Sequence, residues 1–149
     1  MPVFTSHFSK TYKTVLGFVF AIVIATTIPI LNFKNYSSFF IVLTINLSVI
    51  SLLLWIIITT SYTINNNQLI CKSGPFHETI SILNIKKISP HKGLFIPVTF
   101  KPALSHIGLI ISYNYCDDIY ISPKEEKKFV EKLLELNPAI QIEKTKHEL

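Results

Sequence analysis

The stretch FFIVLTINLSVISLLLWIII, residues 39–58, contains no charge, no proline and no glycine. An α-helix rises about 1.5 Å per residue, so twenty residues extend over roughly 30 Å, the thickness of the hydrocarbon core of a bilayer. The stretch is apolar on every side, unlike an amphipathic helix at the surface of a soluble domain. We therefore expect it to cross a membrane. The alternative is a buried core helix of a soluble protein.

A second segment of this kind comes before it. Residues 14–33, between Lys13 and Lys34, are again uncharged and equally long. Residues 32–38 connect the two segments, and a connection this short favours an antiparallel hairpin with both chain ends on one side. A cleaved signal peptide is the alternative, but the apolar run is longer than the usual ~7 to 15 residues. The sequence predicts a transmembrane hairpin over residues 1–60, with spans at 14–33 and 39–58.

The lysines indicate an orientation for this hairpin. Lys10 and Lys13 lie before the first span and Lys72 lies after the second, whereas Lys34 alone lies in the turn. Cytoplasmic loops are enriched in lysine and arginine. We therefore expect a multi-pass protein of the cell membrane, with its termini and the domain after the hairpin in the cytoplasm.

Two features of the spans concern helix packing. Small residues recur every four positions in the first span, at Gly17, Ala21 and Ala25. Such a flat face permits close helix contact, although small residues are also common in membrane helices by chance. Asn46, the amide of the second span, falls at the depth of Thr26 and Thr27, counted from the turn. We expect it to bond to a threonine hydroxyl and to have a structural role, not a transport role.

After residue 58 the continuous apolar pattern gives way to short alternating runs. Seven strands are predicted, at 62–64, 68–72, 79–83, 85–88, 94–100, 107–113 and 119–122. An amphipathic helix follows at 123–136, with Ser122 and Glu125 as a capping box around Pro123, and it ends before Asn137 and Pro138. The fold class is therefore α+β: a two-helix hairpin, then a domain over 61–142 whose small β-barrel or sandwich is capped by a helix, and a polar tail at 143–149.

Several short motifs in this domain resemble a known family. They are Tyr62-Thr63-Ile64, Leu69-Ile70 with Gly74, Ile80, Ile85, Ile88, Pro102-Ala103-Leu104-Ser105, Ile121-Ser122-Pro123, Phe129, Leu133 and Asn137-Pro138. Over roughly residues 60–140 they make the chain similar to bacterial membrane-anchored pleckstrin-homology-like (PH-like) domains, some of which are immunity proteins of bacteriocin producers. The resemblance implies a PH-like fold and a binding role.

The residues that could carry chemistry are few. Cys71 and Cys116 are far apart in the chain, and no spacing of histidine, cysteine and carboxylate residues is typical of a metal site. Ser105 and His106 are neighbours, so in a strand they would point to opposite faces. The four glycines form no phosphate-binding loop. The chain has no arginine, which argues against nucleic acid as a partner. We expect neither an enzyme nor a bound cofactor or metal.

One positive cluster stands out in the domain. It consists of Lys86, Lys87, His91, Lys92 and Lys101. Beside a membrane, such lysines attract anionic lipid headgroups, and a solvated loop is the alternative. The resemblance does not extend to phosphoinositide-binding pleckstrin domains, which bind phosphates with basic residues around the first hairpin turn. Here that turn is Asn65, Asn66 and Asn67, which disfavours specific phosphoinositide recognition.

Two functions from different classes are consistent with the sequence. The preferred one is a membrane-anchored binding module, in which an edge strand or the groove beside the helix takes a protein or peptide partner, in self-protection (immunity) or in envelope regulation. The alternative is an accessory subunit of a membrane transporter or membrane enzyme, with the transmembrane hairpin as the interface.

Overall fold

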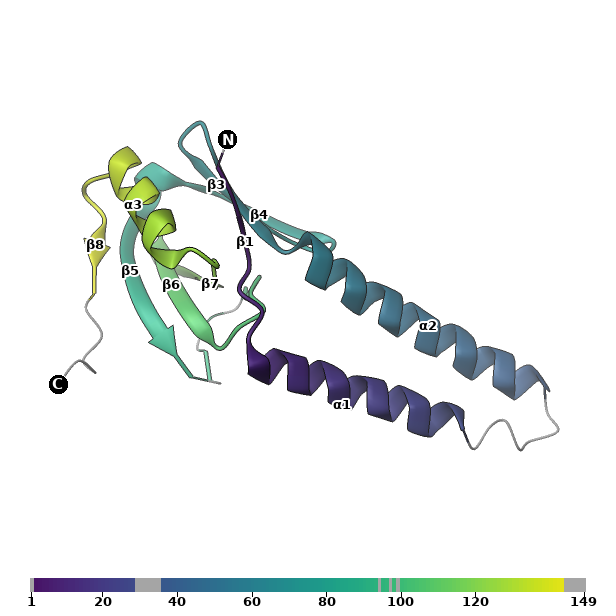
Figure 1. The fold of residues 1–149 in the computed structure, drawn as a ribbon. Coiled ribbons are helices and arrows are strands. Elements are labelled where there is room, and N and C mark those ends of the chain that lie inside the picture. Colours follow the sequence, from purple (N-terminus) through teal and green to yellow (C-terminus); the bar gives the residue numbers. More distant parts are fainter. Residues whose placement is uncertain (1, 29–35, 94, 97, 99, 144–149) are drawn as a thin grey trace.

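Two long helices extend side by side from one end of a β-domain (Figure 1). They are α1, Lys10–Thr27, and α2, Tyr36–Thr59, in a computed structural model that describes residues 2–28, 36–93, 95, 96, 98 and 100–143. Both helices are long and apolar enough to cross a membrane, and none of the apolar stretch of either is buried inside the structure. The predicted turn with Lys34, and the end of the first predicted span, lie outside the described residues.

The ends of these helices are set by local hydrogen bonds. Ser9 caps α1, because its side chain accepts a hydrogen bond from the Tyr12 amide at 3.3 Å. Where the chain leaves α2, Thr60 donates its hydroxyl to the Ile56 carbonyl, and the chain passes directly into a strand. The β-domain therefore begins within one residue of the end of α2.

The described residues of the β-domain form eight strands in two largely antiparallel sheets, with one short parallel pairing. The first sheet has the order β1 (Val3–Thr5), β2 (Ser61–Asn65), β3 (Gln68–Ser73) and β4 (Phe76–Ser81); the second has the order β7 (Asp117–Ile121), β6 (Ile107–Tyr113), β5 (Ile85–Lys92) and β8 (Gln141–Ile142). A 3₁₀ turn, η2 (Ile82–Asn84), connects the sheets, and α3 (Glu126–Leu136) lies across one end. The α+β fold is confirmed. The described strands form two open sheets and not a closed barrel.

The core lies between the two sheets and α3. It combines side chains of the first sheet (Tyr62, Leu69, Ile80), of the second sheet (Ile88, Ile111, Ile121) and of α3 (Phe129, Leu133). The Phe129 ring meets the Phe4 ring edge to face at 5.1 Å and the Tyr62 ring at 6.2 Å. Since Phe4 lies on β1, the segment before α1 is part of this core.

Several predicted strands match the structure closely. The strand at 107–113 has the bounds of β6, and those at 62–64 and 68–72 lie within β2 and β3. The prediction at 79–83 was displaced, because β4 ends at Ser81 and Ile82 begins η2. The strand at 85–88 continues to Lys92 as β5. The Glu143 amide donates to the Ile88 carbonyl on the β8 side, so Pro90, two residues later, has its nitrogen on that side and not towards β6. Pro90 is tolerated because β8 pairs with β5 only at Lys87 and Ile88 and needs no N–H from residue 90.

The predicted strand at 94–100 was wrong over its described residues. Only Phe100 pairs, in a single bridge with Ile119, and the Val98 amide donates back to the Ile96 carbonyl at 2.9 Å. Phe95 is 83% exposed, which does not suit a core strand. Residues 94, 97 and 99 lie outside the description.

The predicted start of the last helix was also wrong. α3 begins at Glu126, and its N-cap, Glu125, makes no side-chain capping bond. The Ser122 hydroxyl, expected to cap this helix, instead lies 2.9 Å from the Ser6 hydroxyl, and Pro123 bridges to Ser6. The N-terminal segment thus competes successfully for the residues that would otherwise form the first turn.

Candidate functional site

The two ends of the hairpin are joined in one sheet. β1 precedes α1 and β2 follows α2, and the two strands pair antiparallel with Phe4 opposite Tyr62. The segment after β1 is fixed as well, since the His7 amide donates to the Ser122 carbonyl at 2.6 Å and the Ser9 amide donates to the Leu104 carbonyl at 3.2 Å. The helices therefore leave the β-domain from anchored positions.

Buried hydroxyl groups hold this junction together. The Tyr62 hydroxyl donates to the Pro102 carbonyl and accepts from the Ser122 amide at 3.1 Å. The Ser6 hydroxyl accepts from the Leu104 amide at 3.1 Å. Burial raises the pKa of Tyr62 to about 12, so the phenol remains protonated, and a donor, well into the alkaline range. The network connects β1, β2, the loop at 102–105 and the end of β7.

A second contact joins α2 to the turn between β3 and β4. The Gly74 amide donates to the Thr59 hydroxyl at 2.8 Å, and the Thr60 and Ser73 hydroxyls are 3.0 Å apart. Gly74 has φ +58°, and a Cβ there would lie 2.7 Å from a side-chain carbon of Ile56. Only glycine fits this close approach without a shift. The junction is therefore fixed at both helices.

Between the helices, next to the β-domain, lies a pocket of about 310 Å³ that we call the hairpin cleft. Its walls are apolar and come from both helices: Val15, Leu16 and Val19 of α1, and Leu53, Ile56 and Ile57 of α2. Phe8, Tyr12, Lys101 and Leu104 lie around its domain end. Lys101 is the charged residue of this lining. The cleft is therefore an apolar space with a cation beside the β-domain.

A second pocket, the α3 groove, lies between α3 and the second sheet and has a volume of about 320 Å³. Ile88, Pro90 and Leu109 line it from the sheet, Val130 and Leu134 from α3, and Ile142 from β8. Glu126, Lys127 and Glu131 are also in its lining. Apolar walls with charged groups of both signs suit an amphipathic segment of a partner.

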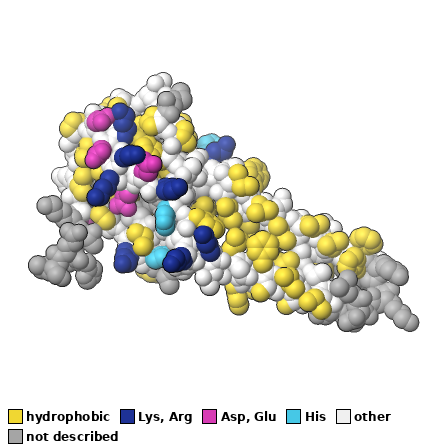
Figure 2. All heavy atoms as spheres, viewed as in Figure 1, with side chains coloured by type: hydrophobic (Ala, Val, Ile, Leu, Met, Phe, Trp, Pro, Cys, Tyr) yellow, Lys and Arg dark blue, Asp and Glu magenta, His cyan; other side chains and the backbone are white. Residues whose placement is uncertain are grey.

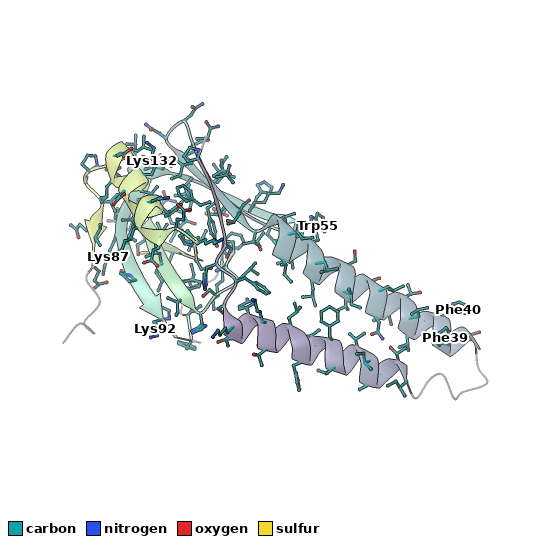
Figure 3. All side chains as sticks on the ribbon, viewed as in Figure 1. Phe39, Phe40, Trp55, Lys87, Lys92 and Lys132 are labelled. Atoms are coloured by element: carbon teal, nitrogen blue, oxygen red, sulfur yellow. The ribbon has the colours of Figure 1, made fainter. Side chains whose placement is uncertain are left out.

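The structure separates the residues of the predicted lipid-contact cluster. Lys86 lies 4.9 Å from the ring of Tyr115, and Lys87 forms an ion pair with Glu143 at 2.8 Å. Figure 3 places Lys87 farther from the helices than Lys92. His91 lies within the β-domain, where its Nε2 is 3.0 Å from the Phe95 carbonyl oxygen. Lys92 and Lys101 are therefore the members on the helix side.

The predicted packing residues of the helices are also separated. Asn46 Nδ2 donates to Thr27 Oγ1 at 2.9 Å and lies 3.4 Å from Thr26 Oγ1, the contact expected from the depth count. The small residues Gly17, Ala21 and Ala25 are all exposed, and a Cβ on Gly17 would meet nothing within 4 Å. The half-buried row of α1 consists of Leu16, Val19, Val23 and Thr27. In the described structure the small-residue face therefore does not pack on α2.

The remaining candidates for chemistry do not converge. The described residues hold no group of three or more histidine, cysteine or carboxylate residues that could bind a metal. Cys71 is buried and Cys116 is exposed, and both are free thiols. Burial raises the pKa of the Cys71 thiol, which keeps it protonated and unreactive. Ser105 donates no proton to His106; its hydroxyl accepts from the Ile107 amide at 3.1 Å.

The first hairpin turn is built as its three asparagines suggest. Asn66 and Asn67 have φ of 43° and 63°, the conformation of a tight turn between twisted strands. The described residues of this turn carry no positive charge, so the turn offers no cation to a phosphate group.

Sequence reasoning missed the junction and the hairpin cleft. The signal for β1 was short: Val3, Phe4 and Thr5 are β-branched or aromatic and favour a strand, but three residues are too few to identify one. The cleft depends on how two helices separate, which no local pattern encodes.

Comparison with known families agrees with this architecture. The profile of the family described as bacterial PH domain matches residues 60–137. Neither the comparison with curated proteins nor the comparison with solved structures gave a significant match. The family match begins where α2 ends, includes both sheets from β2 to β7, and finishes just after α3. Since it covers just over half of the 149 residues, this chain belongs to the bacterial PH domain family.

Proposed function

We propose that this chain is a membrane-anchored binding module: α1 and α2 insert into the bacterial cell membrane, and the β-domain binds a protein or peptide partner at the cytoplasmic face. The observation that carries the proposal is the exposure of the two apolar helices. Phe18 is 68% exposed and Ile58 is 78% exposed. Soluble monomers rarely expose contiguous apolar surface of this kind, and a bilayer would cover it.

The pairing of β1 with β2 supports a position on the same side of the membrane for both ends of the hairpin. The two strands are paired, so the residues before α1 and those after α2 lie on the same side of any membrane that the helices cross. Lys10, Lys13 and Lys72 then lie on the side of the β-domain. Lysine favours the cytoplasmic side of bacterial membranes, and this supports the proposed orientation.

Insertion can be tested by fractionation of cells that produce the full chain. We expect the protein in the membrane fraction, resistant to extraction at alkaline pH and released only by detergent. A purified chain that stays monodisperse in buffer without detergent would overturn the proposed anchoring.

Orientation can be tested with the native cysteines. Cys116 is exposed and Cys71 is buried, so Cys116 is the reporter. A thiol reagent that cannot cross membranes should leave Cys116 unmodified in intact cells and label it once the cells are permeabilised. A Cys116→Ser variant gives the background. Labelling of Cys116 in intact cells would place the β-domain outside.

We propose the α3 groove as the partner site of the β-domain. Its apolar walls lie beside Glu126, Lys127 and Glu131, a composition that suits an amphipathic helix or strand. A photo-crosslinking amino acid at Val130 should give a discrete adduct in cells, whereas the same group at the remote, 93% exposed Tyr115 should not. Equal adducts from both positions would contradict a site in the groove. Self-protection or envelope regulation is the setting that we propose for such a module.

One observation favours the alternative, an accessory subunit of a membrane transporter or enzyme. Gly17, Ala21 and Ala25 form an exposed small-residue face on α1, which could pack against another membrane helix. A crosslinking group at Ala21 should capture a membrane protein if this alternative holds. Replacing α1 and α2 by an unrelated hairpin should then abolish the complex, whereas a simple anchor would be replaceable.

A further inference from the structure

The hairpin cleft is shaped and charged for a lipid. We propose that it binds one acyl chain of an anionic phospholipid, whose phosphate group lies beside Lys101 and Lys13. This inference rests on the proposed insertion of α1 and α2 into a membrane and adds a specific ligand site to it.

The cleft exists because the two helices separate towards the β-domain. Near the far end they are linked by the hydrogen bond between Asn46 and Thr27. At the near end their side chains enclose the cleft of about 310 Å³, and the Ile56–Gly74 contact and the Ser9–Leu104 bond hold each helix against the β-domain. Small-molecule sites begin at about 300 Å³. The space is therefore large enough for part of an acyl chain.

The walls of the cleft exclude most other ligands. They are aliphatic on both helices, with Val15 and Val19 from α1 and Leu53 and Ile57 from α2. No carboxylate is in the described lining, and the hydroxyl groups are those of Tyr12 and Ser73. A polar metabolite would lose its hydrogen bonds to water without replacement, whereas a hydrocarbon chain loses none.

The charge around the cleft has one sign. Lys101 is part of the lining, and Lys13 Nζ lies 6.0 Å from the ring of Phe8, which is also in the lining. The chain has no aspartate or glutamate before Glu78, so α1 and α2 carry no acid. Figure 2 shows the acidic side chains on the β-domain, away from the apolar helices. A negatively charged headgroup at the domain end of the cleft would therefore meet cations and no opposing carboxylate.

Native mass spectrometry of the full chain tests this site. The detergent-solubilised protein is equilibrated with equal amounts of phosphatidylglycerol and phosphatidylcholine that carry the same acyl chains. We expect one retained lipid per chain, with phosphatidylglycerol preferred. Lys101→Gln should lower that preference about fivefold, the effect typical of one juxtamembrane lysine. Lys86→Gln, which removes a lysine remote from the cleft, should leave it unchanged.

A second pair of variants tests the cleft itself. Val19→Phe fills the space and should abolish the retained lipid, whereas Ile24→Phe introduces the same ring at a position that is 57% exposed and should not. Leu53→Phe is an alternative filling variant if Val19→Phe lowers the unfolding temperature of the β-domain.

Three results would overturn the site. They are equal retention of the two lipids, retention that neither filling variant changes, and a dimer that appears in place of a lipid adduct. If the chain inserts into membranes but shows any of these, only the lipid site fails. If the chain needs no detergent at all, the proposed membrane anchoring fails as well, so the two failures are distinguishable.

Discussion

Apolar side chains are exposed in the hairpin and buried in the β-domain. Ile58, in the last turn of α2, is 78% exposed, whereas Ile64, six residues later on β2, is 4% exposed. Along β2 buried residues alternate with partly exposed ones, but α2 has apolar residues on every side. The hydropathy of a segment therefore indicates how much apolar surface must be covered. The periodicity of its apolar residues indicates whether the protein's own core can cover that surface.

The largest expected effect on the free energy of unfolding comes from removing an aromatic ring of the β-domain, compared with removing one of the hairpin. Phe129→Ala should lower the free energy of unfolding of the β-domain by about 3 to 5 kcal/mol, because the ring is fully buried against Phe4 and Tyr62. Phe18→Ala, on the exposed surface of α1, should leave it nearly unchanged. Chemical denaturation in detergent measures both. Equal effects would show that the two regions do not differ as described.

The glycines provide a second matched pair. A Cβ on Gly108 would overlap the Ile121 carbonyl oxygen, whereas one on Gly17 would meet nothing within 4 Å. Gly108→Ala should therefore destabilise the β-domain by about 1 to 3 kcal/mol. Gly17→Ala should be neutral or favour α1, since alanine is the better helix former. Thermal unfolding of the two variants checks this, and a harmless Gly108→Ala would contradict the close packing of β6 on β7.

The junction between the regions depends on hydroxyl groups. Tyr62→Phe removes the bonds to the Pro102 carbonyl and the Ser122 amide and leaves both groups buried. We expect a loss of about 1 to 3 kcal/mol in the free energy of unfolding. Tyr115→Phe, at a 93% exposed position, is the control and should change nothing. A loss of stability in Tyr115→Phe but not in Tyr62→Phe would refute the assigned hydrogen-bond network.

Alkaline pH should weaken the same junction. Tyr62 has its pKa raised to about 12 in the folded chain, against about 10 when unfolded. Above pH 10 the unfolded state releases this proton first, so stability falls by about 1.4 kcal/mol per pH unit until pH 12. Burial also raises the pKa of Tyr120, so Tyr62→Phe should make the fall shallower but not remove it. Denaturation curves at pH 9 to 12 measure the slope. Identical slopes would contradict the raised pKa of Tyr62.

The smallest expected effect lies within the hairpin. Asn46→Ala removes the hydrogen bond to Thr27 and should cost about 0.6 kcal/mol, the average for such bonds between membrane helices. Ser48→Ala is the control, because Ser48 bonds only to the Thr44 carbonyl of its own helix. Unfolding in mixed micelles resolves the difference. A loss above 2 kcal/mol would mean that Asn46 does more than link two helices.

Some elements of the hairpin and of the β-domain could be predicted from the sequence, and others could not. The strand at 107–113 was predicted with its observed bounds because most of its residues are isoleucine or tyrosine, which favour strands, and Asn114 follows it with the positive φ of a turn. The apolar helices were predicted because length and hydropathy suffice for them. The strand at 94–100 failed because Phe95 and Val98 are apolar without being part of a sheet.

The candidate sites were less predictable than the elements. Asn46 could be paired with Thr26 and Thr27 because, in an antiparallel hairpin, residues at equal distances from the turn lie side by side. Lys86 and Lys101 were grouped by nearness in sequence, but β5 and the loop after it carry them to different parts of the β-domain. The capping role of Ser122 was lost to Ser6, a partner 116 residues away in the chain. Local patterns do not contain contacts of that range.

The pairing of β1 with β2 has a consequence for biosynthesis. A ribosome releases Phe4 long before its partner Tyr62, so β1 waits unpaired while the hairpin is made. Closing a loop of that length by diffusion is entropically costly, but two antiparallel helices bring its ends together. The hairpin therefore holds β1 beside β2 once β2 has been made, and β1 then completes this edge of the first sheet.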